Sequence, residues 1–260
     1  MPELPEVETI VRSLAPRLKG QIIRTGRYQP SRVFRGTFPP ELAGVRVAEV
    51  RRYGKYVVFD LDRGVLAVHL GMTGKLLFDV PANRYTRAVW EFDEFSLSLE
   101  DIRQFGRVLW GETIPGPVAA LGPDPLEINR GDFFRRATTY RTAVKALLLN
   151  QRFLRGMGNI YADELLFRAR VHPERRTELI PTSVWTTLWR EMNTLLAEAI
   201  QAGGSSISDY VNTAGEKGSF QLQHQVYAKK GQPCRRCGTA IQKTTLQQRG
   251  THFCPRCQER

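Results

Sequence analysis

The four cysteines of the chain stand near its end as two pairs, and no other cysteine occurs. Cys234 and Cys237 form one CxxC motif, Cys254 and Cys257 form the other, and sixteen residues separate the pairs. Two such motifs at this spacing supply four thiolates in the tetrahedral arrangement that Zn²⁺ prefers. The alternatives are two disulfides or four unrelated thiols. Disulfides need an oxidising compartment, yet the chain starts with no basic or apolar export signal. We therefore expect one structural zinc ion, because four protein ligands leave no position for a catalytic water.

The first residues could supply a nucleophile. Pro2 is small enough for the initiator methionine to be removed, and removal would expose a secondary amine. An α-amino group titrates near pH 7.7–8.0, so on the order of a tenth is neutral at pH 7. Such an amine can attack a sugar C1′ and form an iminium, and the carboxylate of Glu3 is suited to proton transfer. Taken alone, however, a Met-Pro start is common and predicts only an ordinary N-terminus.

The balance of charge indicates a polyanionic partner. Lysine and arginine outnumber aspartate and glutamate by 38 to 26, a formal net charge of +12 at pH 7. Four thiolates with one Zn²⁺ lower this only to about +10. Nucleic acid is the usual partner of so basic a chain. An anionic membrane surface is the alternative, but no basic amphipathic helix stands out and no apolar run is long enough to span a membrane.

The first half of the chain predicts one helix followed by a β-sandwich. Residues 4–19 carry apolar side chains at helical spacing, at Val7, Ile10, Val11, Leu14 and Leu18. From residue 21 to residue 110, short β-branched and aromatic runs alternate with glycine, which is typical of antiparallel strands. The clearest runs are residues 45–50, 56–61, 65–70, 88–92 and 108–110.

The second half is predicted to be helical up to the cysteines. Residues 111–125 are rich in Gly and Pro and have the composition of a linker. Helical patterns then cover residues 141–150, 160–168 and 183–202, and a polar stretch at 205–223 is a candidate mobile loop. The expected fold class is α+β multidomain. It comprises an N-terminal helix plus antiparallel β-sandwich (1–125), a helical domain (126–223) and a four-cysteine zinc-finger β-hairpin (224–260).

Six separated motifs are together similar to those of one enzyme family. They are MPELPEVE (1–8), YGKY (53–56), HLGMTG (69–74), RQFG (103–106), GMGNIYADE (156–164) and QRGTHFCPRC (248–257). In this order, from the first residues to the last, they resemble the formamidopyrimidine-DNA glycosylase family. The resemblance implies a catalytic β-sandwich domain, a helix-two-turn-helix DNA-binding domain and a zinc finger.

Four catalytic residues follow from the resemblance. Pro2 matches the nucleophile that attacks C1′ of the damaged nucleotide and holds it as a Schiff base, and Glu3 matches the carboxylate assigned to proton transfer. Lys55 matches a lysine that assists base excision and β-elimination and contacts a phosphate, although from the residues alone it resembles a solvated strand lysine. Arg249 matches an arginine on the zinc hairpin that grips the phosphates around the lesion and is assigned to δ-elimination.

The resemblance also implies a wedge that fills the gap left by an extruded nucleotide. Met72 matches the side chain that fills the vacated stack, Arg103 the one that takes the orphaned cytosine, and Phe105 the one that unstacks the neighbouring pair. An apolar wedge is a reasonable answer to the cost of unstacking. Without the resemblance, Met72 and Phe105 would be interpreted as core residues.

Phosphate contacts are implied in the helical domain. Asn159 and Tyr161 match residues in the turn of the helix-two-turn-helix motif, and Arg141 and Lys145 lie on the preceding predicted helix, where the family also binds phosphate. Such contacts position the DNA and do not specify its sequence. Residues 208–221 align with the loop that closes over the flipped oxidised purine.

Three further residues have weaker assignments. Glu6 and Glu164 match carboxylates near the family's active site, and Glu164 is equally well interpreted as a structural ion-pair partner. His69 is expected in the core.

Three positions depart from the family pattern. Gln104 replaces the basic residue usual between the wedge arginine and phenylalanine, which removes one contact to DNA. Arg155 stands where the family commonly has a small or aliphatic residue. Arg87, in the stretch 85–87, stands where a histidine for phosphate contact is often found. These changes bear on affinity for DNA and leave the chemistry intact.

The expected function is therefore a bifunctional DNA glycosylase and AP lyase that acts on 8-oxoguanine opposite cytosine and on formamidopyrimidines. One alternative is the related Nei-type enzyme for oxidised pyrimidines, which the MPELPEVE start and the complete wedge disfavour. The other is a zinc-ribbon DNA-binding protein without catalysis, which leaves Pro2, Glu3, Lys55 and Arg249 unexplained. The resemblance further implies a monomer in the bacterial cytoplasm, associated with the nucleoid.

Overall fold

The chain folds into two compact units. The computed structural model describes residues 1–207 and 210–258. Unit 1 consists of Met1–Ala120 with Ile200–Gln221, and unit 2 of Leu121–Ala199 with Leu222–Arg260. The chain therefore leaves unit 1, returns to it once, and leaves it again. Ser208 and Asp209, the first residues of the predicted loop 208–221, lie outside the described residues.

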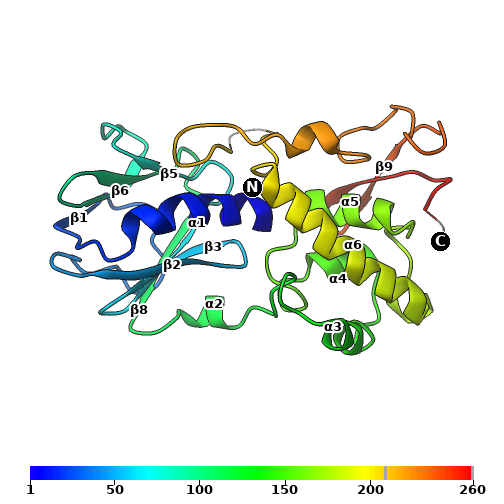
Figure 1. Ribbon diagram of the computed structural model, residues 1–260, viewed down its shortest axis with the longest axis horizontal. Helices are drawn as coiled ribbons and strands as arrows, with labels where there is room; N and C mark the ends of the chain where they lie inside the picture. The colour runs from blue at the N-terminus through cyan, green and yellow to red at the C-terminus, as the bar shows by residue number, and fades with distance from the viewer. Residues whose placement is uncertain (208–209, 259–260) are drawn as a thin grey trace. The chain divides into compact units, whose positions relative to one another are not determined.

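Unit 1 is built on two four-stranded antiparallel sheets (Figure 1). The strand orders are β1-β6-β7-β5 and β2-β3-β4-β8, and every hydrogen-bonded pair is antiparallel. The strands are β1 (Thr25–Tyr28), β2 (Val47–Tyr53), β3 (Tyr56–Leu61), β4 (Val65–His69), β5 (Lys75–Phe78), β6 (Thr86–Glu91), β7 (Ser96–Glu100) and β8 (Arg107–Gly111). The antiparallel sheets expected from the sequence are confirmed.

Helix α1 (Leu4–Leu18) shares one hydrophobic core with residues from both sheets. It buries its predicted apolar stripe, and Figure 1 shows it beside β2 and β3, with which it is in contact. Strand side chains alternate in direction, so Val57 and Phe59 on β3 face this core together. Packing against the sheet fixes the start of α1, and with it the position of residues 2 and 3.

Unit 2 contains most of the helices and a β-hairpin. The remaining elements of the chain are α2 (Gly116–Ala119), α3 (Arg130–Ala137), α4 (Val144–Leu149), α5 (Asn159–Arg168), η1 (Thr177–Leu179), α6 (Thr182–Gln201), η2 (Phe220–Gln223), β9 (Gln242–Leu246) and β10 (Arg249–Phe253). Helix α5 contacts both α4 and β10, so it joins the helices of unit 2 to the hairpin. Within the described residues, no helix is both long and apolar enough to cross a membrane.

Several elements differ from the sequence prediction for local reasons. Helix α4 begins at Val144 and not at residue 141, because Ala143 forms an antiparallel bridge with Arg176. Helix α3 has too weak an apolar pattern to be indicated by the sequence, although Asn129 caps it by accepting a hydrogen bond from the N–H of Asp132 at 2.9 Å. The predicted linker holds the short helix α2.

Candidate functional site

The start of α1 buries the two residues suggested for nucleophilic and proton-transfer chemistry. Pro2 is buried, and Glu3, the N-cap of α1, is 4% exposed. The Glu3 carboxylate accepts a hydrogen bond from the backbone N–H of Glu6, whose own carboxylate accepts from the N–H of Glu3 at 2.8 Å. This capping box satisfies amides that a first helical turn leaves without intrahelical partners. Residues 2 and 3 are thus held by the helix start itself.

Glu6 also ties α1 to the segment that follows α6. Its other carboxylate oxygen accepts a hydrogen bond from the N–H of Ser205 at 2.7 Å. Gly204 has a φ of +79°, and a Cβ there would lie 2.8 Å from Glu6 Oε1, so only glycine fits. The Tyr210 hydroxyl donates to the carbonyl of Gly203 at 3.1 Å and packs in the core of unit 1. No local sequence pattern indicates this link, because Glu6 and Ser205 are 199 positions apart.

Lys55 lies in the tight turn between β2 and β3. Tyr53 pairs with Tyr56, which leaves Gly54 and Lys55 as a two-residue turn. Gly54 has a φ of +62°, as one common turn of this length requires at its first central position. The turn places Lys55 in the interior at 8% exposure, so it is not the solvated strand lysine that composition alone suggests.

Three positive groups converge on one neutral histidine. Burial, followed by the charges of Lys55, Arg107 and the amino terminus of the chain, lowers the pKa of His69 to about 4. The neutral ring accepts a hydrogen bond at Nδ1 from the N–H of Gly71 at 3.0 Å. Lys55 and the amino terminus therefore share one neighbourhood in unit 1. His69, which is expected in the core from the sequence, borders that neighbourhood.

The three predicted wedge residues lie on two loops of unit 1. Met72 follows β4, and Arg103 and Phe105 precede β8. Met72 is 40% exposed and Phe105 is 52% exposed, which contradicts the reading of these side chains as core residues. The Arg103 guanidinium lies over the Phe105 ring, 4.6 Å from its centroid. The structure thus stacks Arg103 on Phe105 and presents all three predicted wedge residues to solvent.

Gln104 has a structural partner of its own. Its φ of +54° turns the loop between Arg103 and Phe105, and its side-chain oxygen accepts a hydrogen bond from the N–H of Arg32 at 3.2 Å. Gln104, which departs from the family pattern, therefore joins the loop that carries Arg103 and Phe105 to the segment between β1 and β2.

Arg249 opens strand β10 in unit 2. Its side chain is exposed and forms no hydrogen bond or ion pair within the described part of the chain. Arg249 pairs with Leu246, which leaves Gln247 and Gln248 as the two-residue tip of the hairpin. Both glutamines have positive φ, 46° and 60°, as a type I′ turn requires, although Asn and Gly are the residues that favour it.

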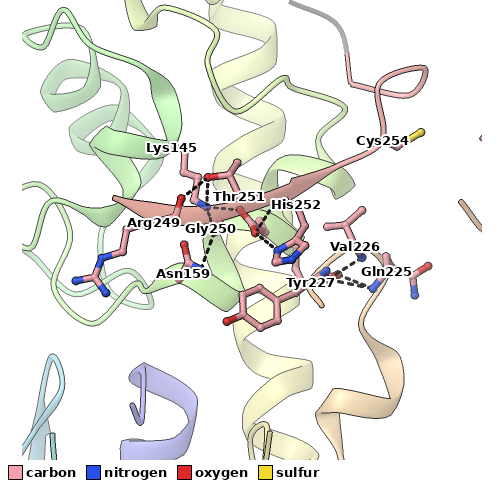
Figure 2. Close-up of polar contacts among 12 residues, drawn as sticks. Lys145, Asn159, Gln225, Val226, Tyr227, Arg249, Gly250, Thr251, His252 and Cys254 are labelled. Carbon is pink, nitrogen blue, oxygen red and sulfur yellow. Dashed lines mark hydrogen bonds and ion pairs between the residues drawn. The ribbon is translucent and has the colours of Figure 1, made fainter. Parts of the chain in front are cut away.

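A buried polar network holds the strand directly after Arg249 (Figure 2). Lys145 Nζ donates to the carbonyl of Gly250 at 3.1 Å and to Thr251 Oγ1 at 2.8 Å, and it lies 2.6 Å from Asp163 Oδ1. Asp163 Oδ2 accepts the N–H of His252 at 2.8 Å. Figure 2 shows the Arg249 side chain pointing away from this network. Residues 250–252 are therefore fixed while Arg249 remains available.

The position of Lys145 corrects the expectation that it contacts a phosphate. Its side chain is fully buried, as is that of Asp163, so its charge faces a carboxylate inside unit 2. Arg141, expected on the same helix, lies three residues before α4 and is exposed. Sequence patterns place Lys145 on a helix, but its partner Asp163 and the strand it contacts are set by tertiary packing.

Asn159 and Tyr161 occupy the first turn of α5. Asn159 Nδ2 donates to the carbonyl of Gly250 at 2.9 Å, a second bond on the carbonyl that Lys145 also contacts. The Tyr161 side chain is fully buried. Gly158, the N-cap, provides no side-chain cap, so the helix start offers backbone amides of the kind that bind phosphate.

Glu164 binds backbone amides. Its buried carboxylate accepts hydrogen bonds from the N–H groups of Gln225, Val226 and Tyr227, at 2.8 to 3.0 Å (Figure 2). Burial raises the pKa of Glu164, and these three amides oppose the rise. Glu164 therefore binds three backbone amides where the structural interpretation predicts an ion-pair partner, and its place near the family's active site stays a prediction.

Two further departures from the family pattern have partners inside their own units. Arg155 Nε lies 3.3 Å from Asp124 Oδ2, and Arg155 Nη1 donates to the carbonyl of Gly122 at 3.3 Å. Arg87 Nε donates to the carbonyl of Asp101 at 3.0 Å. Both arginines therefore support local structure.

The four cysteines fit a zinc ion. Their Sγ atoms all lie within 4.8 Å of one another, with Cys234 to Cys257 at 3.9 Å and Cys237 to Cys254 at 3.5 Å. A tetrahedron with Zn–S bonds of about 2.3 Å has S···S edges of about 3.8 Å. These distances exclude disulfide bonds. The Sγ atoms of Cys234 and Cys254 each accept a backbone N–H at 3.4 Å, which suits thiolates.

Removing zinc is expected to unfold the hairpin and to leave the sheets of unit 1 intact. The cysteines pack with only a few apolar residues, including Phe167, Val226 and Ile241, and so small a core depends on its metal. Hydrogen exchange after chelation should show loss of protection in β9 and β10 and retained protection in β2 and β3. Added Zn²⁺ should restore the pattern and Mg²⁺ should not. Continued protection of β9 and β10 without metal would contradict a structural zinc.

Three family models match consecutive parts of the chain. Residues 1–108 match the formamidopyrimidine-DNA glycosylase N-terminal domain, and residues 121–211 match the formamidopyrimidine-DNA glycosylase H2TH domain. Residues 231–260 match a zinc finger found in FPG and IleRS.

Whole-chain relatives agree with these matches. The chain is 48% identical to a formamidopyrimidine-DNA glycosylase of Solibacter usitatus over 265 residues, covering all of both chains. It is similar to the crystal structure of MutM (Fpg) from Thermus thermophilus, with 39% identity, a TM-score of 0.89 and coverage of 99% and 98%. It is also similar to a Lactococcus lactis Fpg variant in complex with DNA containing Fapy-dG, with 34% identity, a TM-score of 0.90 and full coverage of both chains.

Proposed function

Because this chain belongs to the formamidopyrimidine-DNA glycosylase family, we propose that it removes oxidised purines from duplex DNA and then cleaves the strand as an AP lyase. The substrates are 8-oxoguanine opposite cytosine and formamidopyrimidines. The protein acts as a monomer in the bacterial cytoplasm, on nucleoid DNA. Its functional parts are the catalytic domain 1–125, the helix-two-turn-helix domain 126–223 with the lesion loop at 208–221, and the zinc finger 224–260.

The chemistry begins at Pro2 once Met1 has been removed. The amine lone pair attacks C1′, the N-glycosidic bond breaks, and the base leaves with a proton. Loss of the amine proton and opening of the sugar ring give an iminium between Pro2 and C1′. Glu3 carries the protons of these steps. β-Elimination and then δ-elimination break the two C–O bonds to phosphate, with Lys55 assisting the first and Arg249 the second.

The burial of Pro2, Glu3 and Lys55 in unit 1 supports this proposal, together with the pKa of His69, which Lys55 and the α-amino group of Met1 both lower. A neighbouring cation favours the neutral form of an amine, which is the nucleophilic form. His69 stays neutral at physiological pH and therefore adds no further positive charge that would repel a bound iminium. The same positive groups suit the phosphates on either side of a lesion.

The other residues place the DNA. Met72, Arg103 and Phe105 fill the space left by the extruded nucleotide, and Arg103 faces the orphaned cytosine. Arg141 and the first turn of α5, with Asn159 and Tyr161, hold backbone phosphates. Zinc binds to Cys234, Cys237, Cys254 and Cys257 and has a structural role, because it keeps folded the hairpin that presents Arg249.

Trapping with borohydride tests the proposal. The zinc-loaded protein without Met1 is incubated with a duplex that carries 8-oxoguanine opposite cytosine, in the presence of borohydride. We expect a covalent adduct that peptide mapping places on Pro2, because borohydride reduces the iminium to a stable amine. A duplex with guanine at the same position is the control.

Two other outcomes would redirect the assignment. DNA binding without any adduct would mean a non-catalytic zinc-ribbon protein. Faster excision of an oxidised pyrimidine than of 8-oxoguanine would mean Nei-type specificity.

A further inference from the structure

A buried carboxylate lies between the two loops that carry the wedge. We call residues 70–74 and 101–106 the wedge loops, since they hold Met72, Arg103 and Phe105. Asp101 is 0% exposed, and none of its contacts in the described chain is an ion pair. Burying a carboxylate costs free energy unless hydrogen bonds satisfy its oxygens. The groups that donate these hydrogen bonds therefore indicate what Asp101 does.

Asp101 joins the wedge loops through its two carboxylate oxygens. Oδ1 accepts a hydrogen bond from Thr73 Oγ1 at 2.5 Å, and Oδ2 accepts one from the N–H of Gly106 at 2.8 Å. Thr73 Oγ1 in turn accepts from the N–H of Arg103 at 3.1 Å. Thr73, the neighbour of Met72, is thereby linked through its hydroxyl to the backbone of Arg103.

The two loops also pack backbone against backbone. A Cβ on Gly71, which has a φ of +59°, would lie 2.4 Å from the carbonyl carbon of Phe105. A Cβ on Gly106 would lie 2.9 Å from Asp101 Oδ2 and 2.9 Å from the carbonyl of His69. Such approaches leave no room for either loop to slide past the other.

We propose that Asp101 is a positioning residue for base extrusion, with Thr73 as its partner, and that it makes the wedge loops one rigid body. This inference rests on the proposed function. Unstacking a paired base costs free energy that the inserted side chains must offset. Side chains already held in place offset it better than side chains that must first be ordered. Loss of the bonds of Asp101 should therefore slow the step that inserts the wedge more than it slows the later steps.

Three variants separate the bonds from the fold. Asp101→Asn keeps the size of the side chain and one acceptor oxygen for the N–H of Gly106, but its Nδ2 can only donate to Thr73 Oγ1, so the bond to Thr73 is reversed and two charge-assisted hydrogen bonds become neutral ones. Thr73→Val removes the bridging hydroxyl, and Thr73→Ser retains it. Asp93→Asn is the matched control, because Asp93 is an exposed carboxylate of the same unit that pairs with Arg24.

Two single-turnover reactions distinguish positioning from general damage. One is excision of 8-oxoguanine from a duplex, and the other is strand cleavage at a preformed abasic site, where there is no base to extrude. Asp101→Asn and Thr73→Val should slow excision by about tenfold to a hundredfold, the range that loss of one buried hydrogen bond produces. Cleavage at the abasic site should stay within about twofold of the parent, and Thr73→Ser and Asp93→Asn should match the parent in both reactions.

Fluorescence of 2-aminopurine beside the lesion provides a readout that needs no catalysis, because it rises when the base unstacks. Asp101→Asn and Thr73→Val should reduce the rise on binding, and Thr73→Ser should preserve it. Equal loss in both reactions, an unchanged excision rate, or the same loss in Thr73→Ser as in Thr73→Val would each overturn the role of Asp101. A parent protein that unstacks the base and does not excise it would refute the proposed function and leave this inference standing.

Discussion

Glu3→Gln is expected to slow base excision by about 10²–10⁴-fold, the usual contribution of a positioned general acid or base. Glutamine keeps an oxygen that can accept the N–H of Glu6, so the cap of α1 should persist. The loss should therefore fall on proton transfer and not on folding. Single-turnover excision of 8-oxoguanine measures the effect, and thermal unfolding checks the fold.

Glu49→Gln is the control for this experiment. Glu49 is exposed on β2 in the same unit, so its substitution removes a carboxylate without touching the start of α1. An excision rate near the parent's in Glu3→Gln would remove Glu3 from the mechanism. A large fall in melting temperature would instead assign Glu3 a mainly structural role as the helix cap.

Lys145→Met is expected to destabilise unit 2 by about 3–5 kcal/mol, because it leaves Asp163 as a buried charge without its cation. It also removes the two hydrogen bonds that Lys145 Nζ donates to the Gly250 carbonyl and to Thr251 Oγ1, which should weaken δ-elimination by loosening the strand that begins at Arg249. Denaturant unfolding measures the stability, and the ratio of δ- to β-elimination products measures the second effect. Adding Asp163→Asn to Lys145→Met should recover part of the stability, because the unpaired charge is then absent.

Salt dependence separates this role from a phosphate contact. Each phosphate that a side chain neutralises contributes about 0.9 to the slope of log K against log salt concentration. Lys145→Met should leave that slope unchanged, measured under conditions in which the variant is folded, and Arg249→Ala should reduce it. A reduced slope for Lys145→Met would restore the phosphate assignment.

The elements of this fold could be predicted largely from the chain itself. The stripe on α1 follows the helical periodicity, and the runs at 56–61 and 65–70 are rich in β-branched and other apolar residues, so local sequence determines these elements. The zinc ligands can be predicted equally well, because the spacing of the cysteines is a local property of the sequence. Strand β5, of four residues, carries too few positions for a pattern to emerge.

The partners of the site residues are set by tertiary packing. Nothing local to Glu6 indicates Ser205, and nothing local to Asp163 indicates Lys145 or His252. The resemblance to a family implies roles for Pro2, Lys55 and Arg249, but it also implies that Lys145 contacts a phosphate. The burial of Lys145 decides between a phosphate contact and a structural ion pair. That burial depends on which strand packs against α4 and α5.

The tip of the zinc hairpin has a consequence for the metal. Gln247 and Gln248 both hold positive φ, a conformation that costs residues other than glycine about 1–3 kcal/mol each. Folding of the hairpin and chelation are one equilibrium, so this cost weakens the apparent affinity for zinc. Two residues that touch no sulfur thus help to determine how readily the protein exchanges metal with its surroundings, and when zinc is scarce they favour the form in which Arg249 is no longer presented.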